Sequence, residues 1–113
     1  MIPKFEIYTG ETGGLMTSDK YLNFKWINPD CNILFSVTRQ GNAASVHFAS
    51  DEAGRYKLKE AVEDWCEFCF WLFDWCTIIV GVIKRHSVCK LAEKCGFTYL
   101  MPLGDKLVYV RGI

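Results

Sequence analysis

The sequence predicts a mixed α/β (α+β) domain in which helices pack on one β-sheet. Three observations support this fold class: two β-branched segments joined by a turn, an amphipathic helical segment directly after them, and a further strand and helix before a terminal hairpin. From residue 31 onward the expected order of elements is β-β-α-β-α-β-β. The chain has 113 residues, 50% of them hydrophobic, which favours one compact domain.

The N-terminal part shows the weakest pattern. Residues 5–9 alternate between apolar and polar side chains, which predicts a short strand, and the glycine-rich stretch 10–14 ends it. Residues 16–24 are expected to contain a short helix. The turn residues Asn28, Pro29 and Asp30 then separate this part from the regular pattern that follows.

The first regular elements are two strands over residues 31–38 and 44–49, with a hairpin turn at 40–42. Ser50 is the expected N-cap of a helix whose first turn carries Asp51 and Glu52. Apolar side chains then recur at spacings of three and four, which predicts a central helix of about 16 to 20 residues. Its predicted core face is formed by Leu58, Ala61, Val62, Trp65, Cys66, Cys69, Leu72 and Phe73.

The second half continues with an apolar run over residues 77–83, typical of a strand covered on both faces. Ser87 is the expected cap of a second helix, and Gly96 the left-handed residue that ends it. Residues 98–101 and 107–110 predict a terminal hairpin.

Composition excludes several classes of protein. A formal net charge of zero argues against a nonspecific nucleic-acid-binding protein. Glu67 and Asp74 interrupt the longest apolar segment, so we expect no transmembrane helix and no membrane partner. The start of the chain lacks a signal peptide pattern, and the six cysteines are interpreted as reduced, buried thiols of a cytoplasmic protein. Cys66 and Cys69 lie in a helix without a second ligand pair, so no metal site is expected.

Residues 93–97 read Glu-Lys-Cys-Gly-Phe at the end of the second predicted helix. This motif and the order of elements around it resemble the C-terminal half of the GNAT superfamily of N-acetyltransferases. The resemblance covers residues 31–111 and leaves 1–30 as a divergent, shortened N-terminal part of a single domain spanning 1–113. Small GNAT-like proteins of this kind are similar to ones encoded by tailed bacteriophages, which would place the chain in the host cytoplasm.

The resemblance implies that acetyl-CoA lies between two central parallel strands and donates its acetyl group directly to an amine. Backbone N–H groups near Phe48 and Ala49 would polarise the thioester carbonyl, and the following loop would hold the pyrophosphate. The implied cofactor-binding residues are Phe48, Ala49, Ser50, Ala53, Gly54, Arg55 and Tyr56. Two features depart from the family: Asp51 and Glu52 bring carboxylates to the pyrophosphate loop, and Ala92 replaces a tyrosine that protonates the leaving thiolate in many members.

The chain has two histidines, His47 and His86, and both are candidates for the catalytic base that deprotonates the amine. His47 alternates away from the side chains of its neighbours on the predicted strand. The alternative interpretation makes His47 a partly exposed strand residue and His86 a solvated residue before the second helix.

A second group of aromatic side chains, Phe68, Trp71 and Trp75, lies on another face of the central helix. Either the N-terminal segment covers this face, or it binds a protein partner or a second copy of the chain in a homodimer. Two functions therefore remain open. The chain is an acetyl-CoA-dependent N-acyltransferase acting on an amine of a small molecule or protein, or a catalytically inactive phage protein that binds proteins, as a virion component or inhibitor of a host protein.

Overall fold

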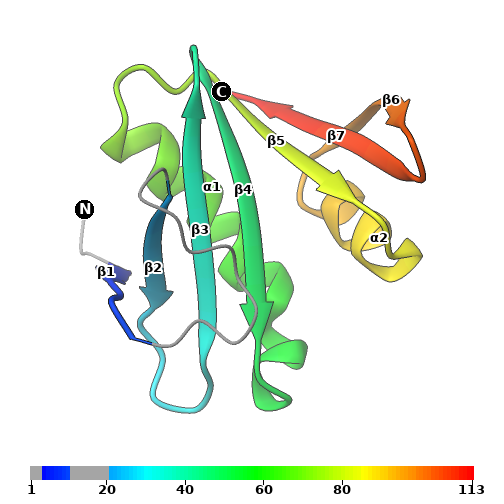
Figure 1. Cartoon of the computed structure of the whole chain (residues 1–113). Helices are drawn as coiled ribbons and strands as arrows, with labels where there is room; N and C mark the ends of the chain where they lie inside the picture. The colour runs from blue at the N-terminus through cyan, green and yellow to red at the C-terminus, as the bar shows by residue number, and fades with distance from the viewer. Residues whose placement is uncertain (1–3, 11–20) are drawn as a thin grey trace.

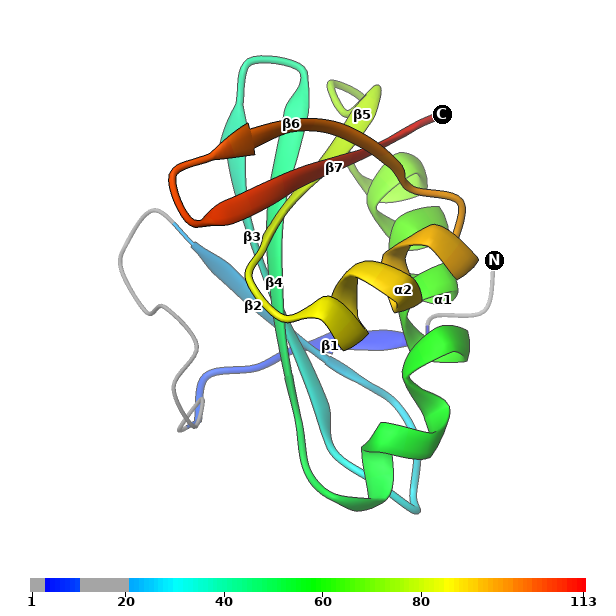
Figure 2. The same cartoon turned by 90° about the vertical axis from the view of Figure 1, so that its right-hand side faces the viewer.

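The computed structural model describes residues 4–10 and 21–113, which form a seven-stranded sheet with two α-helices on one face (Figure 1, Figure 2). The strand order is β1-β2-β3-β4-β5-β7-β6, and only the pair β4 and β5 is parallel. The predicted mixed α/β class is confirmed. In chain order the elements are β1 (Phe5–Ile7), β2 (Leu22–Trp26), β3 (Ile33–Gln40), β4 (Ala43–Ser50), the 3-10 helix η1 (Ala53–Lys57), α1 (Leu58–Leu72), β5 (Ile78–Ile83), α2 (His86–Lys94), β6 (Thr98–Leu103) and β7 (Lys106–Gly112).

The hairpin of β3 and β4 confirms the predicted strand pair. All eight residues of β3 pair with β4, and the chain reverses through Gly41, which has a φ of +65°. Glycine adopts this left-handed conformation without the steric cost that a side chain brings. The predicted turn at residues 28–30 is also confirmed, because the Asn28 side chain accepts the backbone N–H of Asp30 at 2.8 Å.

Strand β2 corrects the expectation of a short helix over residues 16–24. Phe24 and Trp26, two residues apart, are both buried in the core, while Asn23 and Lys25, which alternate with them, are half-buried. This period of two matches a strand that pairs with β3, and the gain from that pairing overrides a weak helical pattern. The rest of the expected helix, residues 16–20, lies outside the described residues.

The core lies between the sheet and α1, and Trp65 is its largest fully buried side chain. The Trp65 ring stacks on Phe35 of β3, with centroids 4.8 Å apart and planes at 17°. The rings of Phe5 from β1 and Phe24 from β2 pack against the same indole, with centroid distances of 5.2 and 5.5 Å. Aromatic burial of this kind contributes several kcal/mol per ring, about 3–5 for truncation of a buried Trp or Phe to alanine. The N-terminal strands are therefore part of the core.

The two predicted serine caps are wrong. The hydroxyl of Ser50 donates to the Asp51 carbonyl, and the Asp51 carboxylate accepts the backbone N–H of Gly54 instead. The second helix begins at His86, one residue before Ser87, and has no side-chain cap. Its end is as predicted: Gly96 has a φ of +86°, and the N–H of the following residue, Phe97, reaches the Ala92 carbonyl at 2.9 Å.

All six cysteines are free and buried, which confirms that they pack as small apolar side chains. Burial raises the pKa of the Cys66 thiol to about 12, so the thiolate is not formed near neutral pH. No helix among the described residues is long and apolar enough to cross a membrane.

Gly54 has a packing role that gives a stability prediction. A Cβ at this position would approach Ile33 Cγ1 to 2.7 Å and also overlap Ser50 Oγ. We expect Gly54→Ala to lower the free energy of unfolding by about 1–3 kcal/mol, the usual cost of overpacking. Gly112→Ala is the matched control, because nothing lies within 4 Å of its Cβ position. Urea unfolding of both variants tests this, and equal effects would contradict it.

Candidate functional site

Strands β4 and β5 pair over only three residues each, from Ala43 opposite Ile78 to Ser45 opposite Val80. Beyond this point the two strands diverge, and Figure 1 shows β5 running away from β4 toward α2. β4 continues to Ser50 and β5 to Ile83. The carboxyl halves of two central parallel strands are therefore separated, and the sheet is open between them.

A cleft of about 740 Å³ occupies this opening. Most of its lining is apolar, with residues from β4, β5 and both helices. The apolar residues from the helices are Leu58, Val62, Trp65, Val88, Leu91 and Ala92. A cleft of this size and lining suits a small ligand with an extended, uncharged part.

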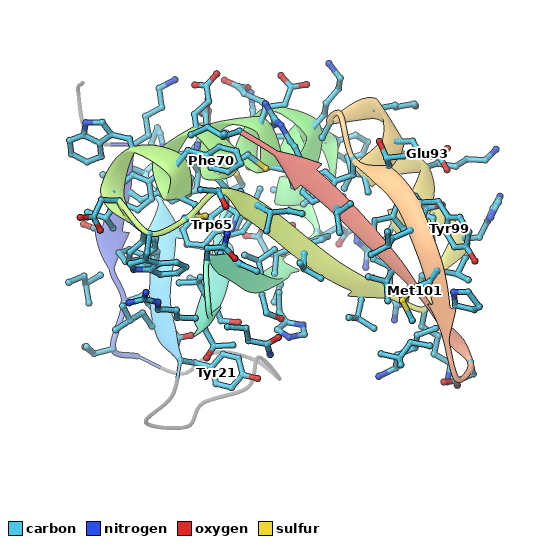
Figure 3. All side chains as sticks on the ribbon, turned by 90° about the horizontal axis from the view of Figure 1, so that it is seen from above. Tyr21, Trp65, Phe70, Glu93, Tyr99 and Met101 are labelled. Atoms are coloured by element: carbon cyan, nitrogen blue, oxygen red, sulfur yellow. The ribbon has the colours of Figure 1, made fainter. Side chains whose placement is uncertain are left out.

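The cleft is lined by residues from both faces of the sheet. Val46 and Phe48 pack against the core on the helical face, because they pair with Val37 and Phe35. His47 alternates to the other face and also lines the cleft. Its ring lies 6.2 Å from the ring of Tyr21, which Figure 3 shows on the opposite side of the sheet from α1. A ligand bound on the helical face can therefore meet a second ligand through the opening.

The backbone of β4 beyond Ser45 directs N–H groups into the opening. Asp51 donates its N–H to the Asn32 carbonyl on the β3 side at 3.0 Å, and N–H directions alternate along a strand. The N–H of Ala49 therefore points to β3, and that of Phe48 points toward β5. Because pairing with β5 ends at Ser45, the Phe48 N–H faces the cleft. The expected pair of donors near Phe48 and Ala49 is thus reduced to Phe48.

The two histidines differ in position. His47 is half-buried in the cleft wall, and burial, together with the charge of Lys106, lowers its pKa below the ordinary value of 6.5. It is neutral at pH 7, the state that a proton acceptor needs. His86 is the first residue of α2, is exposed, and is not among the residues lining the cleft.

The side chain of Asp51 accepts hydrogen bonds from within the loop after β4 and from Asn32. One oxygen of the Asp51 carboxylate accepts the N–H of Gly54 at 2.8 Å, and the other accepts the backbone N–H and side-chain amide of Asn32 at 3.0 and 3.2 Å. The bond from Gly54 is the first of these hydrogen bonds that lower the pKa of Asp51. The carboxylate is therefore ionised, and it takes the place at Gly54 that an external anion would use.

The implied cofactor-binding residues divide into two groups. Phe48, Ala49, Ser50 and Arg55 line the cleft, whereas Ala53, Gly54 and Tyr56 do not. Gly54 is buried against β3, and Tyr56 is 91% exposed. The glycine therefore allows the loop to approach the sheet, where the resemblance implied a close approach to a phosphate.

Three further residues, Lys84, Arg85 and Ser87, follow β5 and line the cleft, and they were not predicted as site residues. The signal was present in the sequence. Neighbouring parallel strands have their carboxyl ends at the same edge of the sheet. The residues after β5 therefore lie near those after β4. A polar stretch directly after the second predicted parallel strand is therefore a candidate part of the site.

No described tyrosine lines the cleft. Ala92, at the position where the resemblance implies a tyrosine that protonates the leaving thiolate, is part of the cleft wall. Tyr109 is buried outside the cleft, and its hydroxyl donates to Glu93 at 2.9 Å. This bond raises the pKa of Tyr109 to about 12. Proton transfer to a leaving group cannot use either residue.

The three aromatic residues proposed as a partner surface do not form one exposed patch. Phe68 is buried, with Phe5 and Phe24 at 4.8 and 5.4 Å. Trp75 is half-buried, and the guanidinium of Arg39 lies 4.9 Å above its ring. Trp71 alone of the three is exposed, at 57%, next to the exposed Leu72. The interpretation that N-terminal segments cover this face holds for Phe68.

No family model and no curated protein matches the sequence. The fold is similar to several solved structures. The GNAT domain of PAT from S. lividans superposes with a TM-score of 0.70 at 10% identity, over 86% of this chain and 64% of that one. N-acetyltransferase PseH from Campylobacter jejuni, in complex with acetyl coenzyme A, gives 0.66 at 9% identity, over 84% and 70%. A mutant of spermidine N-acetyltransferase SpeG from Vibrio cholerae gives 0.65 at 13% identity, over 81% and 64%.

The environment of His47 gives a prediction for its titration. We expect its pKa, measured from the imidazole proton shifts by NMR, to lie below 6.5. Lys106→Gln removes one of the two causes and raises this pKa, while Lys90→Gln, an exposed residue of α2, leaves it unchanged. A His47 pKa at or above 6.5 in the unmodified chain would show that the ring is not held in the cleft wall.

Proposed function

Because the chain has the fold of the GNAT N-acetyltransferases, we propose that it transfers an acyl group from a pantetheine thioester, such as acetyl-CoA, to an amine. The observation that supports this function best is the cleft through the sheet. It offers the Phe48 N–H in the opening and the neutral His47 on the face opposite the helices. In such an arrangement an acyl donor and its acceptor can reach the opening from opposite faces of the sheet.

The proposed reaction is a direct attack. The extended arm of the donor lies along the apolar walls on the helical face, with its thioester carbonyl at Phe48. The amine enters from the face of His47, which takes a proton from the amine nitrogen as the C–N bond forms. The Phe48 N–H stabilises the oxyanion of the tetrahedral intermediate. The C–S bond then breaks, and solvent protonates the leaving thiolate, since Ala92 supplies no proton.

The two histidines provide a matched test of this mechanism. We expect His47→Gln to lower the rate of acyl transfer at pH 7 by about 10²–10⁴-fold, the usual contribution of a general base, without changing donor affinity. His86→Gln should leave both unchanged, because His86 lies outside the cleft. The assay follows loss of the thioester with a panel of small amines as acceptors, and calorimetry measures donor binding.

One result would overturn the proposed function, and another would overturn the role of His47. Absence of binding at millimolar acetyl-CoA and millimolar acetyl-phosphopantetheine would remove the acyltransferase function altogether. Equal loss of rate in both histidine variants would retain the function and exclude His47 as the base. The pH profile adds a separate check: with a weakly basic acceptor amine that stays neutral over the range, the rate should fall as pH drops below the lowered pKa of His47.

The alternative function, binding of a protein partner or a second copy, now depends on Trp71 and Leu72. Both side chains lie at the end of α1, exposed by 57% and 41%. If this end of α1 holds a homodimer, Trp71→Ala should reduce the mass measured by light scattering to that of one chain. Tyr56→Ala, the removal of a still more exposed ring elsewhere, is the control. A monomeric unmodified chain would exclude the homodimer.

A further inference from the structure

The mouth of the cleft has two walls with different electrostatic properties. One wall is the loop after β4, which contributes Ser50 and Arg55 to the lining; Asp51 and Glu52 belong to this loop but do not line the cleft. The other wall is the segment after β5. Because every phosphopantetheine donor carries its negative charge at the end remote from the thioester, these segments decide which donor the cleft accepts.

The loop after β4 has little capacity for an anion. Three of its backbone N–H groups are used within the structure: Asp51 donates to Asn32, Gly54 to the Asp51 carboxylate, and Arg55 to the Glu52 carbonyl at 3.3 Å. The Asp51 carboxylate itself is ionised and adds a negative charge at the same place. A diphosphate bound here would lose the hydrogen bonds that it needs and would face a fixed carboxylate.

Positive charge is available elsewhere in the lining, on Arg55, Lys84 and Arg85. Lys84 is partly neutralised by Asp105, 3.2 Å away. Within residues 4–10 and 21–113, no carboxylate forms a salt bridge with Arg55 or Arg85. These two guanidinium groups are therefore free for a phosphate oxygen pair, which arginine binds well. Two free guanidinium groups match the charge of one phosphate group better than that of a diphosphate with a nucleotide.

We propose that the cleft selects an acyl thioester of phosphopantetheine, which carries one phosphate, over the coenzyme A thioester. This specificity rests on the proposed acyltransferase function and assigns its determinant to Asp51. The apolar cleft holds the pantetheine arm, and Arg55 and Arg85 hold the phosphate. The Asp51 carboxylate occupies the Gly54 N–H and is held by Asn32, so the loop after β4 offers that group to no diphosphate.

Calorimetry with two donors tests the specificity directly. We expect acetyl-phosphopantetheine to bind more tightly than acetyl-CoA, although coenzyme A has many more atoms available for contacts. If acetyl-CoA binds equally or more tightly, the specificity is wrong, while the acyltransferase function stands. If neither donor binds, the proposed function fails together with the specificity.

A pair of variants locates the determinant. Asp51→Ala removes the carboxylate and frees the Gly54 N–H, so the affinity for acetyl-CoA relative to acetyl-phosphopantetheine should rise about tenfold. Asp74→Asn removes a charge just beyond the far end of α1, about 22 Å along a helix of 15 residues, and should leave this ratio unchanged. An unchanged ratio in a folded Asp51→Ala protein, with folding checked by circular dichroism, would overturn the role of Asp51.

Phosphopantetheine occurs free or attached to a carrier protein through the same phosphate, so the transfer assay includes both forms. Faster transfer from an acetylated carrier protein than from the free thioester identifies a carrier-borne donor. Faster transfer from the free thioester identifies the small molecule. Either rate exceeding that with acetyl-CoA supports the specificity, and transfer fastest from acetyl-CoA contradicts it.

Discussion

Strands β4 and β5 stop pairing after Ser45 and Val80, and the candidate site depends on this limit. Each strand is bound along its full length on its other side, β4 to β3 and β5 to β7. Neither strand can turn back to close the gap without breaking those ladders. The backbone of β4 beyond Ser45 is therefore left facing a cleft, a position in which an N–H group needs a partner from a ligand or from water.

The aromatic core maintains this geometry. Trp65 lies under the sheet beside the opening, stacked on Phe35, and it also lines the cleft. Its position is set by rings that come from the first strands of the chain, Phe5 and Phe24. The Asp64 carboxylate of α1 accepts hydrogen bonds from the Lys4 ammonium and from the Trp26 indole, both at 3.1 Å. These bonds connect the N-terminal segments to α1. The N-terminal part thus supports the wall of the site.

Much of the fold follows from local sequence patterns, and the site follows less well. The strand pair around Gly41, the helical spacing along α1 and the Gly96 turn are short-range features, so they were predicted correctly. The strand β2 was missed because its pattern becomes decisive only when β3 is beside it. Hydrophobic spacing also suggested one aromatic face on α1, but it cannot show that Phe5 and Phe24 cover Phe68 and leave Trp71 exposed.

Part of the cleft lining was implied by the resemblance. Of the residues that it implied, Phe48, Ala49, Ser50 and Arg55 line the cleft, whereas Ala53, Gly54 and Tyr56 do not. Lys84 and Arg85 required the knowledge that two parallel strands end at the same edge. The role of Asp51 required atomic detail: a carboxylate before a helix predicts favourable charge, but only its bonds to Gly54 and Asn32 show that it closes the loop.

The central claim is that the sheet opens where β4 runs beyond Ser45, and that the Phe48 N–H faces this opening. Amide hydrogen exchange measured by NMR tests it most directly, because adjacent residues serve as each other's control. We expect the Phe48 N–H to exchange at least about 100-fold faster than the Ala49 N–H, which is paired with β3, and a bound donor to slow Phe48 and leave Ala49 unchanged. Equal protection of the two amides in the free protein would contradict it.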